Sequence, residues 1–400
     1  MRRWFPRLLV IAFGMQFVVY AIRPLLSYQA LALGAGTTAL GVITASFSVL
    51  SLVAAVPLGR RIDRSGETFF LIAGAGLLSA VALALLAPPH LVTLTLCSAA
   101  LGLGHLTTLT AMQTLIANGG SDRLSARFAS FTVVSSIGIT VGPAVVGLLV
   151  GGVSVTAAGT DVRVANAGRV FLVAAVAAAL SCLIAISLRM RPDTLAARPA
   201  ASGEPVAKGT VRRVMSMPSM PNAMAASLTV LVALDLLATY LPAYGEANGI
   251  PVRTVGFLLA TQGLAALASR VFMLPLIAAL TRRRLLALSM LLAAAALCAV
   301  PFTDSVPVLY GLMVFAGLGL GLGQPLTLTW VADRAPREVR GTAIGIRLSG
   351  NRLGQTVLPP AIGGIAGAAG LAAAFVSPAL LLAIAGTFVL RSRFTGSAGP

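Results

Sequence analysis

Acidic side chains are scarce in this chain of 400 residues, which has 11 Asp and Glu against 29 Lys and Arg. It also has only two histidines and three cysteines, and the cysteines all fall inside apolar runs. This distribution predicts neither a disulfide framework nor a metal site, and no motif pairs a nucleophile with a base or forms a phosphate loop. We therefore expect no enzymatic activity, no catalytic residues, no metal and no cofactor.

Apolar residues dominate the sequence. Hydrophobic residues make up 58% and charged residues 10% of the sequence, whereas charged residues are roughly a quarter of a soluble protein. A membrane-spanning helix needs about 20 apolar residues. Twelve apolar runs have about this length, so we predict an all-α membrane protein with twelve transmembrane helices at 8–33, 41–58, 68–87, 91–117, 128–152, 169–188, 222–244, 254–280, 285–302, 307–330, 342–369 and 371–390.

One polar interval separates the first six runs from the last six. Residues 189–221 contain prolines, glycines and basic residues, a composition typical of a flexible linker. This predicts an N-terminal six-helix bundle over 1–190, a cytoplasmic linker over 191–220 and a C-terminal six-helix bundle over 221–400. An even number of spans in each bundle places both termini on one side of the membrane.

A repeat relates the two halves. Gly138, Pro143 and Gly147 recur 216 positions later, and the recurring residues are Gly354, Pro359 and Gly363. The run that begins Leu-Gly-Leu-Gly at residue 101 recurs at residue 320, which makes His105 and Gln324 counterparts. Near-equal offsets in chain order indicate a duplication, with two pseudo-symmetric bundles that run in the same direction.

Basic residues are distributed unequally between the two sides. Arg163, Arg169 and Arg253 are the only ones in the loops opposite the termini, and most others lie at the termini, in the linker or in the loops on the termini's side. The positive-inside rule then places both termini in the cytoplasm, in an inner membrane. Anionic lipid headgroups explain these cations, so we expect membrane lipids and no nucleic acid as partners.

The segment after the second span carries a recognisable motif, Gly59-Arg60-Arg61-Ile62-Asp63-Arg64-Ser65-Gly66. Together with Gly-x-x-x-Gly-Pro in the fifth span and the duplicated frame, it resembles the major facilitator superfamily over essentially the whole chain. The resemblance implies that Gly59, Asp63, Arg64 and Gly66 form a cytoplasmic latch, in which the glycines allow a tight turn. The other interpretation is a short basic loop that only fixes topology. Glu67 departs from the family pattern, which has basic residues there.

The fifth span holds Gly138 and Gly142 on one face, where they allow close approach of another helix, and Pro143 removes a backbone donor and bends the helix. Gly354, Pro359 and Gly363 are expected to do the same in the second half. The resemblance associates this pattern with exporters that exchange a solute for protons. Ordinary tight packing is the alternative interpretation, and Val146 stands where a second glycine is often found.

Asp235 is the only acid well inside a predicted span. A charge at that depth costs several kcal/mol unless it is paired. Burial disfavours the charged form of a carboxyl and a nearby arginine favours it, so Asp235 is a candidate to bind and release a proton. A static ion pair with Arg23 or Arg270 is the alternative.

The resemblance places spans 1, 4, 7 and 10 around a central cavity. Polar residues in the spans are therefore candidates to bind substrate, namely Arg23, His105, Gln324, Arg270 and Arg352. His105 is a second proton-coupling candidate, although a lone intramembrane histidine is more often a packing residue. The fourth span lacks the arginine that many efflux relatives carry. Arg347, near the cytoplasmic end of its span, is expected to extend to the membrane surface.

These features predict a secondary active transporter, in which two bundles rock to give alternating access. The main prediction is proton-coupled export of a small amphipathic solute, by a monomer. One alternative is uptake or facilitated passage of a small anionic metabolite, motivated by Arg23, Arg270 and Arg352. Another is a membrane sensor or enzyme that has lost transport.

Overall fold

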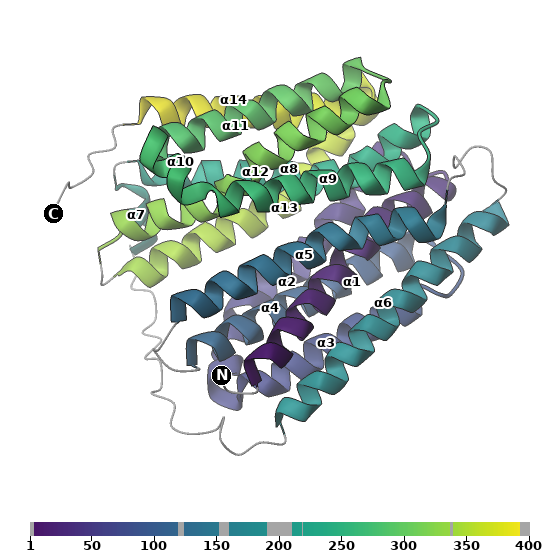
Figure 1. The fold of residues 1–400 in the computed structure, drawn as a ribbon, viewed down its shortest axis with the longest axis horizontal. Helices are drawn as coiled ribbons and strands as arrows, with labels where there is room; N and C mark the ends of the chain where they lie inside the picture. The colour runs from purple at the N-terminus through teal and green to yellow at the C-terminus, as the bar shows by residue number, and fades with distance from the viewer. Residues whose placement is uncertain are drawn as a thin grey trace.

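The structure, a computed structural model, describes residues 4–118, 124–151, 160–189, 210–217, 219–336 and 339–392. Regular structure in these ranges is entirely helical (Figure 1). The helices of the first half are α1 (Trp4–Ala32), α2 (Thr37–Ser65), α3 (Glu67–Ala84), α4 (Leu91–Asn118), α5 (Leu124–Val150) and α6 (Thr160–Arg189). Those that follow are α7 (Thr210–Met215), α8 (Met220–Ala247), α9 (Val252–Val271), α10 (Met273–Leu280), α11 (Arg282–Ala299), α12 (Val306–Arg334), α13 (Arg340–Ala369) and α14 (Ala373–Arg391), with a 3₁₀ turn at Val300–Phe302.

Eleven helices in the described part are long and apolar enough to cross a membrane. The remaining long helix, α13, has 30 residues but is not among the eleven. It carries Arg347, Asn351, Arg352 and Gln355, which lower its hydropathy. The predicted eighth span is broken into α9 and α10 at Phe272. Together these helices give the all-α membrane fold predicted from the apolar runs.

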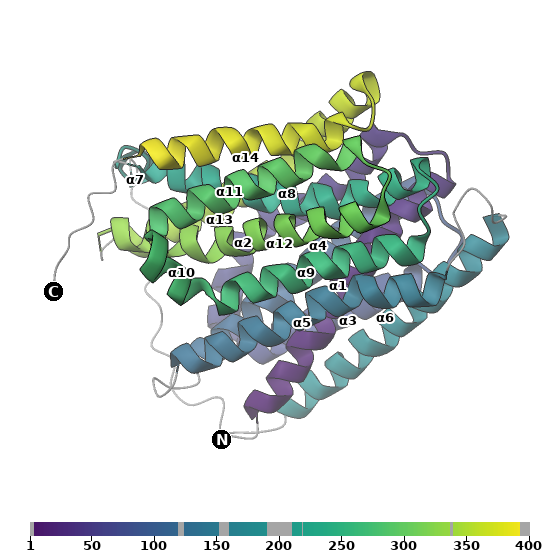
Figure 2. The ribbon, with the colours of Figure 1, turned by 45° about the horizontal axis from the view of Figure 1, so that its top comes forward.

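The two halves repeat the same packing. In the first half α1 packs on α5 and α6, α3 packs on α4 and α6, and α2 packs on α4. In the second half α8 packs on α13 and α14, α11 packs on α12 and α14, and α9 packs on α12. These are equivalent pairs, since α8 to α14 follow the order of α1 to α6 with α9 and α10 sharing the place of α2. Figures 1 and 2 show the two bundles lying side by side.

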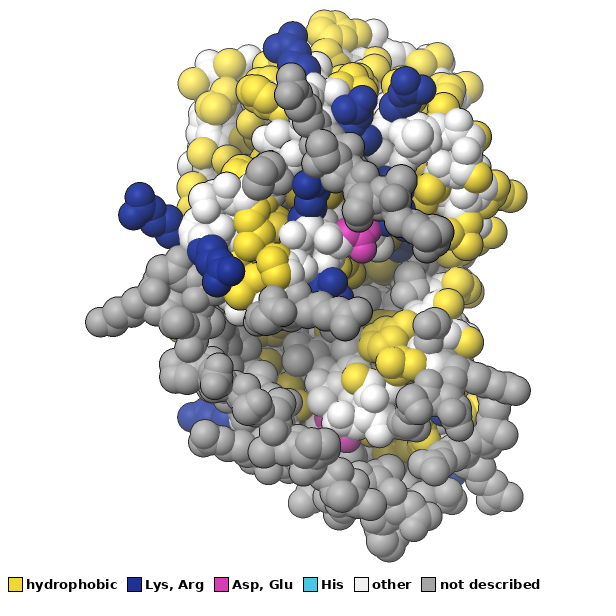
Figure 3. Space-filling view, turned by 90° about the vertical axis from the view of Figure 1, so that its left-hand side faces the viewer, with side chains coloured by type: hydrophobic (Ala, Val, Ile, Leu, Met, Phe, Trp, Pro, Cys, Tyr) yellow, Lys and Arg dark blue, Asp and Glu magenta, His cyan; other side chains and the backbone are white. Residues whose placement is uncertain are grey.

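The ends of the bundle differ in charge. We call the end at which α1 begins and α14 ends the near end, and the opposite end, where α1 ends and α2 begins, the far end (Figures 1 and 2). Lys and Arg side chains gather on the near end, where few Asp or Glu side chains are seen (Figure 3). Of the described arginines, Arg253 lies in the first turn of α9 and Arg169 in the first third of α6, both toward the far end. The distribution therefore has the asymmetry that the sequence predicts.

The segment expected to be a loop after the second span is mostly helical. Helix α2 continues through Gly59 to Ser65, and only Gly66 turns the chain, with a φ of 97° that favours glycine. The expectation of a tight turn at both glycines is therefore wrong for Gly59, because a basic helix end can extend beyond the apolar span into the headgroup region. The side chains of Asp63 and Arg64 lie outside the described residues, so the latch stays a prediction.

The repeated glycines and prolines have equivalent places in the two halves. A Cβ atom on Gly138 would collide with α1 at Phe13, and one on Gly354 would collide with α8 at Leu228. Each of these glycines therefore allows its helix to pack on the first helix of its own bundle.

The later members of the repeat contact the opposite bundle instead. A Cβ atom on Gly147 would lie 2.8 Å from the carbonyl oxygen of Arg253 in α9, and one on Gly363 would lie 2.7 Å from that of Thr37 in α2. The carbonyl of Pro143 approaches Gly256, and that of Pro359 approaches Gly41. Both contacts lie toward the far end, so the two halves meet there through two equivalent glycine contacts, α5 with α9 and α13 with α2.

A substitution inside the first bundle tests how tightly it is packed. A Cβ atom on Gly102 of α4 would overlap the carbonyl oxygen of Phe47 in α2. We expect Gly102→Ala to lower the free energy of unfolding by about 1–3 kcal/mol, because two backbones must move apart. Thermal unfolding in detergent measures this, with Gly76→Ala of α3 as control, since a Cβ atom there meets no heavy atom within 4 Å. Equal melting temperatures for the two variants would contradict the packing described.

Candidate functional site

An ion pair joins the two bundles near the middle of their first helices. Nη1 of Arg23 in α1 lies 2.7 Å from Oδ1 of Asp235 in α8, and the two side chains are only 10% and 6% exposed. The guanidinium of Arg23 also lies over the ring of Phe47 from α2, 4.7 Å from its centroid. Cation–π attraction and the ion pair together hold Arg23 in place. Of the two pairings considered from sequence, the structure therefore has Asp235 with Arg23.

The second carboxylate oxygen of Asp235 is also bonded. Nε2 of Gln355 in α13 donates a short hydrogen bond to Oδ2 of Asp235, and Oε1 of Gln355 accepts one from Nη1 of Arg352 at 3.2 Å. Gln355 was missed in the sequence analysis. The available signal was an amide side chain inside an apolar run, three residues after Arg352 and therefore on the same side of the helix.

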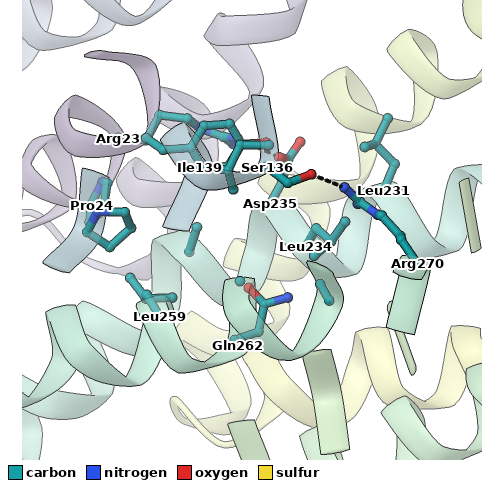
Figure 4. A pocket seen from close by; sticks show the side chains of 15 residues that line it. Arg23, Pro24, Ser136, Ile139, Leu231, Leu234, Asp235, Leu259, Gln262 and Arg270 are labelled. Atoms are coloured by element: carbon teal, nitrogen blue, oxygen red, sulfur yellow. Dashed lines mark hydrogen bonds and ion pairs between the residues drawn. The ribbon is translucent and has the colours of Figure 1, made fainter. Parts of the chain in front are cut away.

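Arg270 of α9 approaches the same centre from the other side of Asp235 (Figure 4). Its Nη1 donates to Oγ of Ser136 in α5 at 2.8 Å, and its Nε donates to the carbonyl oxygen of Gly321 in α12 at 3.0 Å. Both acceptors are neutral. Arg270 thus bridges the two bundles at a second place, without a carboxylate partner among the described residues.

A cavity of about 70 Å³ lies between the bundles at this point. Helices α1, α5, α8 and α9 line it, through Tyr20, Arg23, Pro24, Ser136, Ile139, Pro143, Leu231, Leu234, Asp235, Ala238, Leu259, Gln262, Gly263, Ala266 and Arg270. Pockets for drug-sized ligands measure roughly 300–1,000 Å³. The site is therefore contracted in this conformation, and a solute of that size requires the bundles to move apart.

Hydrogen bonds between the bundles close the cavity toward the far end. The hydroxyl of Tyr240 in α8 donates to the carbonyl oxygen of Thr37 in α2 at 2.9 Å, and Oγ1 of Thr37 donates to the carbonyl oxygen of Gly363 at 3.0 Å. Closer to the cavity, the hydroxyls of Thr44 and Thr239 lie 2.8 Å apart. These contacts, with the glycine contacts described above, form a far gate.

Removal of one gate bond provides a test. We expect Tyr240→Phe to weaken the closed gate by about 0.5–1.5 kcal/mol, the net value of a typical hydrogen bond. A cysteine introduced at Ala238, which lines the cavity behind the gate, should then react faster with a membrane-impermeant thiol reagent. Tyr310→Phe in α12 is the control, since no gate contact involves Tyr310. Unchanged reactivity in Tyr240→Phe would show that this bond does not hold the gate.

The other predicted cavity residues have their own partners inside the bundles. His105 lies 3.0 Å from Oε1 of Gln16 in α1 and packs beside the ring of Phe47. Gln324 donates to the carbonyl oxygen of Ser227 in α8 at 2.8 Å. These counterparts of the repeat therefore each bond to the first helix of their own half. Neither residue lines the cavity. Helices α1, α5, α8 and α9 line it, so the prediction that the fourth and tenth spans contribute to it is wrong for this cavity.

Arg347 is placed differently from the expectation. Its side chain does not extend to the membrane surface but is buried, with 4% of the residue exposed. Nη2 donates to Oε1 of Gln324 at 2.7 Å and to Oγ1 of Thr327 at 3.1 Å. The expectation is wrong because α12 offers several oxygen acceptors within the bundle, so Arg347 bonds there instead of reaching the headgroups.

Two repeated helical bundles that enclose a cavity with a few charged side chains within the membrane are the architecture of a membrane transporter. The chain belongs to the major facilitator superfamily, because the model of the Major Facilitator Superfamily matches residues 8–252 and 223–398. No curated protein matches the chain.

Solved transporter structures have the same fold at low sequence identity. A variant of the nucleoside transporter NupG is 13% identical with a TM-score of 0.79, over 97% of this chain and 99% of that one. A POT family transporter in complex with 5-aminolevulinic acid is 14% identical with a TM-score of 0.78, over 97% and 95%. A bacterial homologue of the human lysosomal transporter Spinster is 15% identical with a TM-score of 0.73, over 96% and 95%. These similarities concern the fold alone.

Proposed function

We propose that the chain is a proton-coupled secondary transporter in which Asp235 carries the proton. The observation that supports this most is the Arg23–Asp235 ion pair, because it joins the two bundles that alternating access requires to move. A proton on Asp235 removes its charge and with it the Coulomb attraction to Arg23. Proton binding and movement of the bundles are then linked through one contact.

The membrane orientation follows from charge. We place the near end, with its cluster of basic residues, in the cytoplasm, in agreement with the positive-inside rule. The far gate then faces the outside and is closed in this conformation. A solute enters from the cytoplasm when the cavity widens toward the near end, and from outside when the far gate opens.

Export of a small amphipathic solute in exchange for protons is one form of this function. The Gly138 to Pro143 pattern of α5 and the mostly apolar wall of the cavity favour it. Transport of a small anion is the second form. It is favoured by Arg270, which lines the cavity and is bonded only to neutral oxygens. His105 stays a second proton-coupling candidate, because its ring packs beside Phe47, over whose ring the guanidinium of Arg23 lies.

The free energy released by one proton is large enough to drive accumulation of a solute. One proton crossing 100 mV supplies about 2.3 kcal/mol, which corresponds to roughly 50-fold accumulation of a neutral solute. Purified protein in liposomes that contain a pH-sensitive dye tests the proposal. With an imposed proton gradient, we expect solute movement to be accompanied by proton flux. Solute movement without any proton flux would rule out proton coupling while leaving transport intact.

A further inference from the structure

Positive charge exceeds negative charge at the centre of the membrane. Arg23, Arg270 and Arg352 all lie close enough to Tyr20 to interact with it electrostatically, as does Asp235. Among the residues that the structure describes, every other Asp or Glu lies in a connecting segment or within the outer turns of a helix. The centre therefore holds three guanidiniums and one carboxylate, with a surplus of two positive charges when Asp235 is ionised.

The protein's own hydrogen bonds leave part of this charge uncompensated. Nη2 of Arg23 is buried and has no hydrogen-bond partner among the described residues. Arg270 donates to a serine hydroxyl and a backbone carbonyl. Arg352 donates to the amide oxygen of Gln355. An isolated charge in a medium of low dielectric constant is costly, and an anion placed between these groups relieves that cost.

We propose that the transported solute carries a carboxylate or phosphate group, which binds in the cavity between Arg23 and Arg270, and that the proton and the anion bind together. This proposal rests on the proposed proton-coupled transport. Arg23 and Arg270 both line the cavity, on opposite bundles, so an anion bound between them contacts both halves (Figure 4). Planar guanidiniums suit such oxyanion groups because they donate parallel hydrogen bonds.

Joint binding follows from the position of Asp235. In this conformation its carboxylate accepts the hydrogen bond of Nη1 of Arg23, and its negative charge repels an incoming anion. Arg23 and Gln355 bond to the carboxylate, Arg352 of α13 bonds to Gln355, and Tyr20 of α1 and Arg270 of α9 line the same cavity. When a proton from solution binds the carboxylate, the ion pair breaks, Arg23 becomes available and the repulsion disappears. The proton therefore raises the affinity for the anion, and the anion raises the affinity for the proton by the same factor.

Joint binding of a proton and an anion determines the direction in which the solute moves. Cotransport of a proton and an anion under an inward proton gradient moves the anion into the cell. Exchange of a proton for a solute moves the solute out. The site's charge thus favours uptake over the export that the pattern in α5 suggests.

Binding and transport of defined probes test this inference with the full chain in liposomes. The probes are benzoate, lactate and inorganic phosphate as anions, and tetraphenylphosphonium as a lipophilic cation. We expect at least one anion to bind more tightly at acid than at neutral pH and to enter together with protons. Arg270→Gln should weaken its binding by at least about tenfold, since a hydrogen bond to a charged group is lost. Arg270→Lys should retain part of the affinity because the charge remains.

Two further variants make the result specific. Asp235→Asn should still bind the anion but with an affinity independent of pH. Arg391→Gln, at the exposed end of α14, should behave as the wild type. Proton-coupled movement of tetraphenylphosphonium, with no binding of any anion, would overturn the anion inference and leave proton coupling standing. Anion binding that weakens on acidification would overturn joint binding, and absence of proton flux with every probe would instead overturn the proposed function.

Discussion

Asp235→Asn is expected to abolish proton-driven accumulation of solute, while exchange of labelled for unlabelled solute across the membrane continues. Asparagine has nearly the shape of the protonated carboxyl and cannot release a proton, so the cavity is kept in one protonation state. For an anion moved with one proton the step carries no net charge, so the accumulation lost is about tenfold for each unit of imposed pH gradient. Uptake into liposomes, with and without a proton gradient, measures both activities in one preparation.

Controls separate coupling from folding. Asp235→Ala removes the partner of Arg23, and breaking a buried ion pair in this way costs about 3–5 kcal/mol. Its melting temperature should therefore fall more than that of Asp235→Asn, in which the amide still accepts a hydrogen bond. An Asp235→Asn protein that accumulates solute against its gradient as well as the wild type would show that the proton is carried elsewhere.

The second large effect is expected from Gly256→Val, at the contact between α5 and α9. A Cβ atom on Gly256 would lie 2.8 Å from the Cα of Gly147 and even closer to the carbonyl oxygen of Pro143. Overpacking of this kind costs about 1–3 kcal/mol, which shifts a two-state equilibrium roughly 5- to 150-fold. Because the contact joins the bundles only when the far end is closed, the variant should populate the state open at the far end. Its transport rate should fall accordingly.

A matched substitution isolates the gate. Gly364→Val in α13 introduces the same side chain where a Cβ atom meets no heavy atom within 4 Å. We expect this variant to transport normally. The melting temperature of Gly256→Val should be close to that of the wild type, since its bundle interiors are unchanged. Normal transport by Gly256→Val would show that the far gate does not need this close approach.

The architecture could be predicted from the sequence because local features determine it. Apolar runs of spanning length predict the helices, and the duplicated glycines and prolines predict two equivalent bundles. Gly138 and Gly354 occupy equivalent places, which their offset alone indicated. The extent of α2 beyond the apolar run was missed, because a hydropathy boundary is not a helix boundary at the membrane surface.

The site was only partly predictable. The cost of burying a charge singles out Asp235, Arg23 and Arg270, and the structure brings all three to one cavity. Which arginine pairs with Asp235 depends on the distance between helices more than two hundred residues apart in sequence, which no local pattern specifies. The same reason explains why Arg347 bonds inside the bundle and why His105 is bonded to Gln16 and does not line the cavity.

The central claim is that a proton on Asp235 controls the relative position of the two bundles. Spin labels on cysteines introduced at His90 and Asp304, exposed positions at the far ends of the two bundles, report this position. The native cysteines are replaced by alanine in all samples. The account predicts that acidification changes the distribution of distances in the protein with Asp235, and that Asp235→Asn gives one distribution at acid and neutral pH. A pH-dependent change in Asp235→Asn equal to that of the parent protein would contradict it.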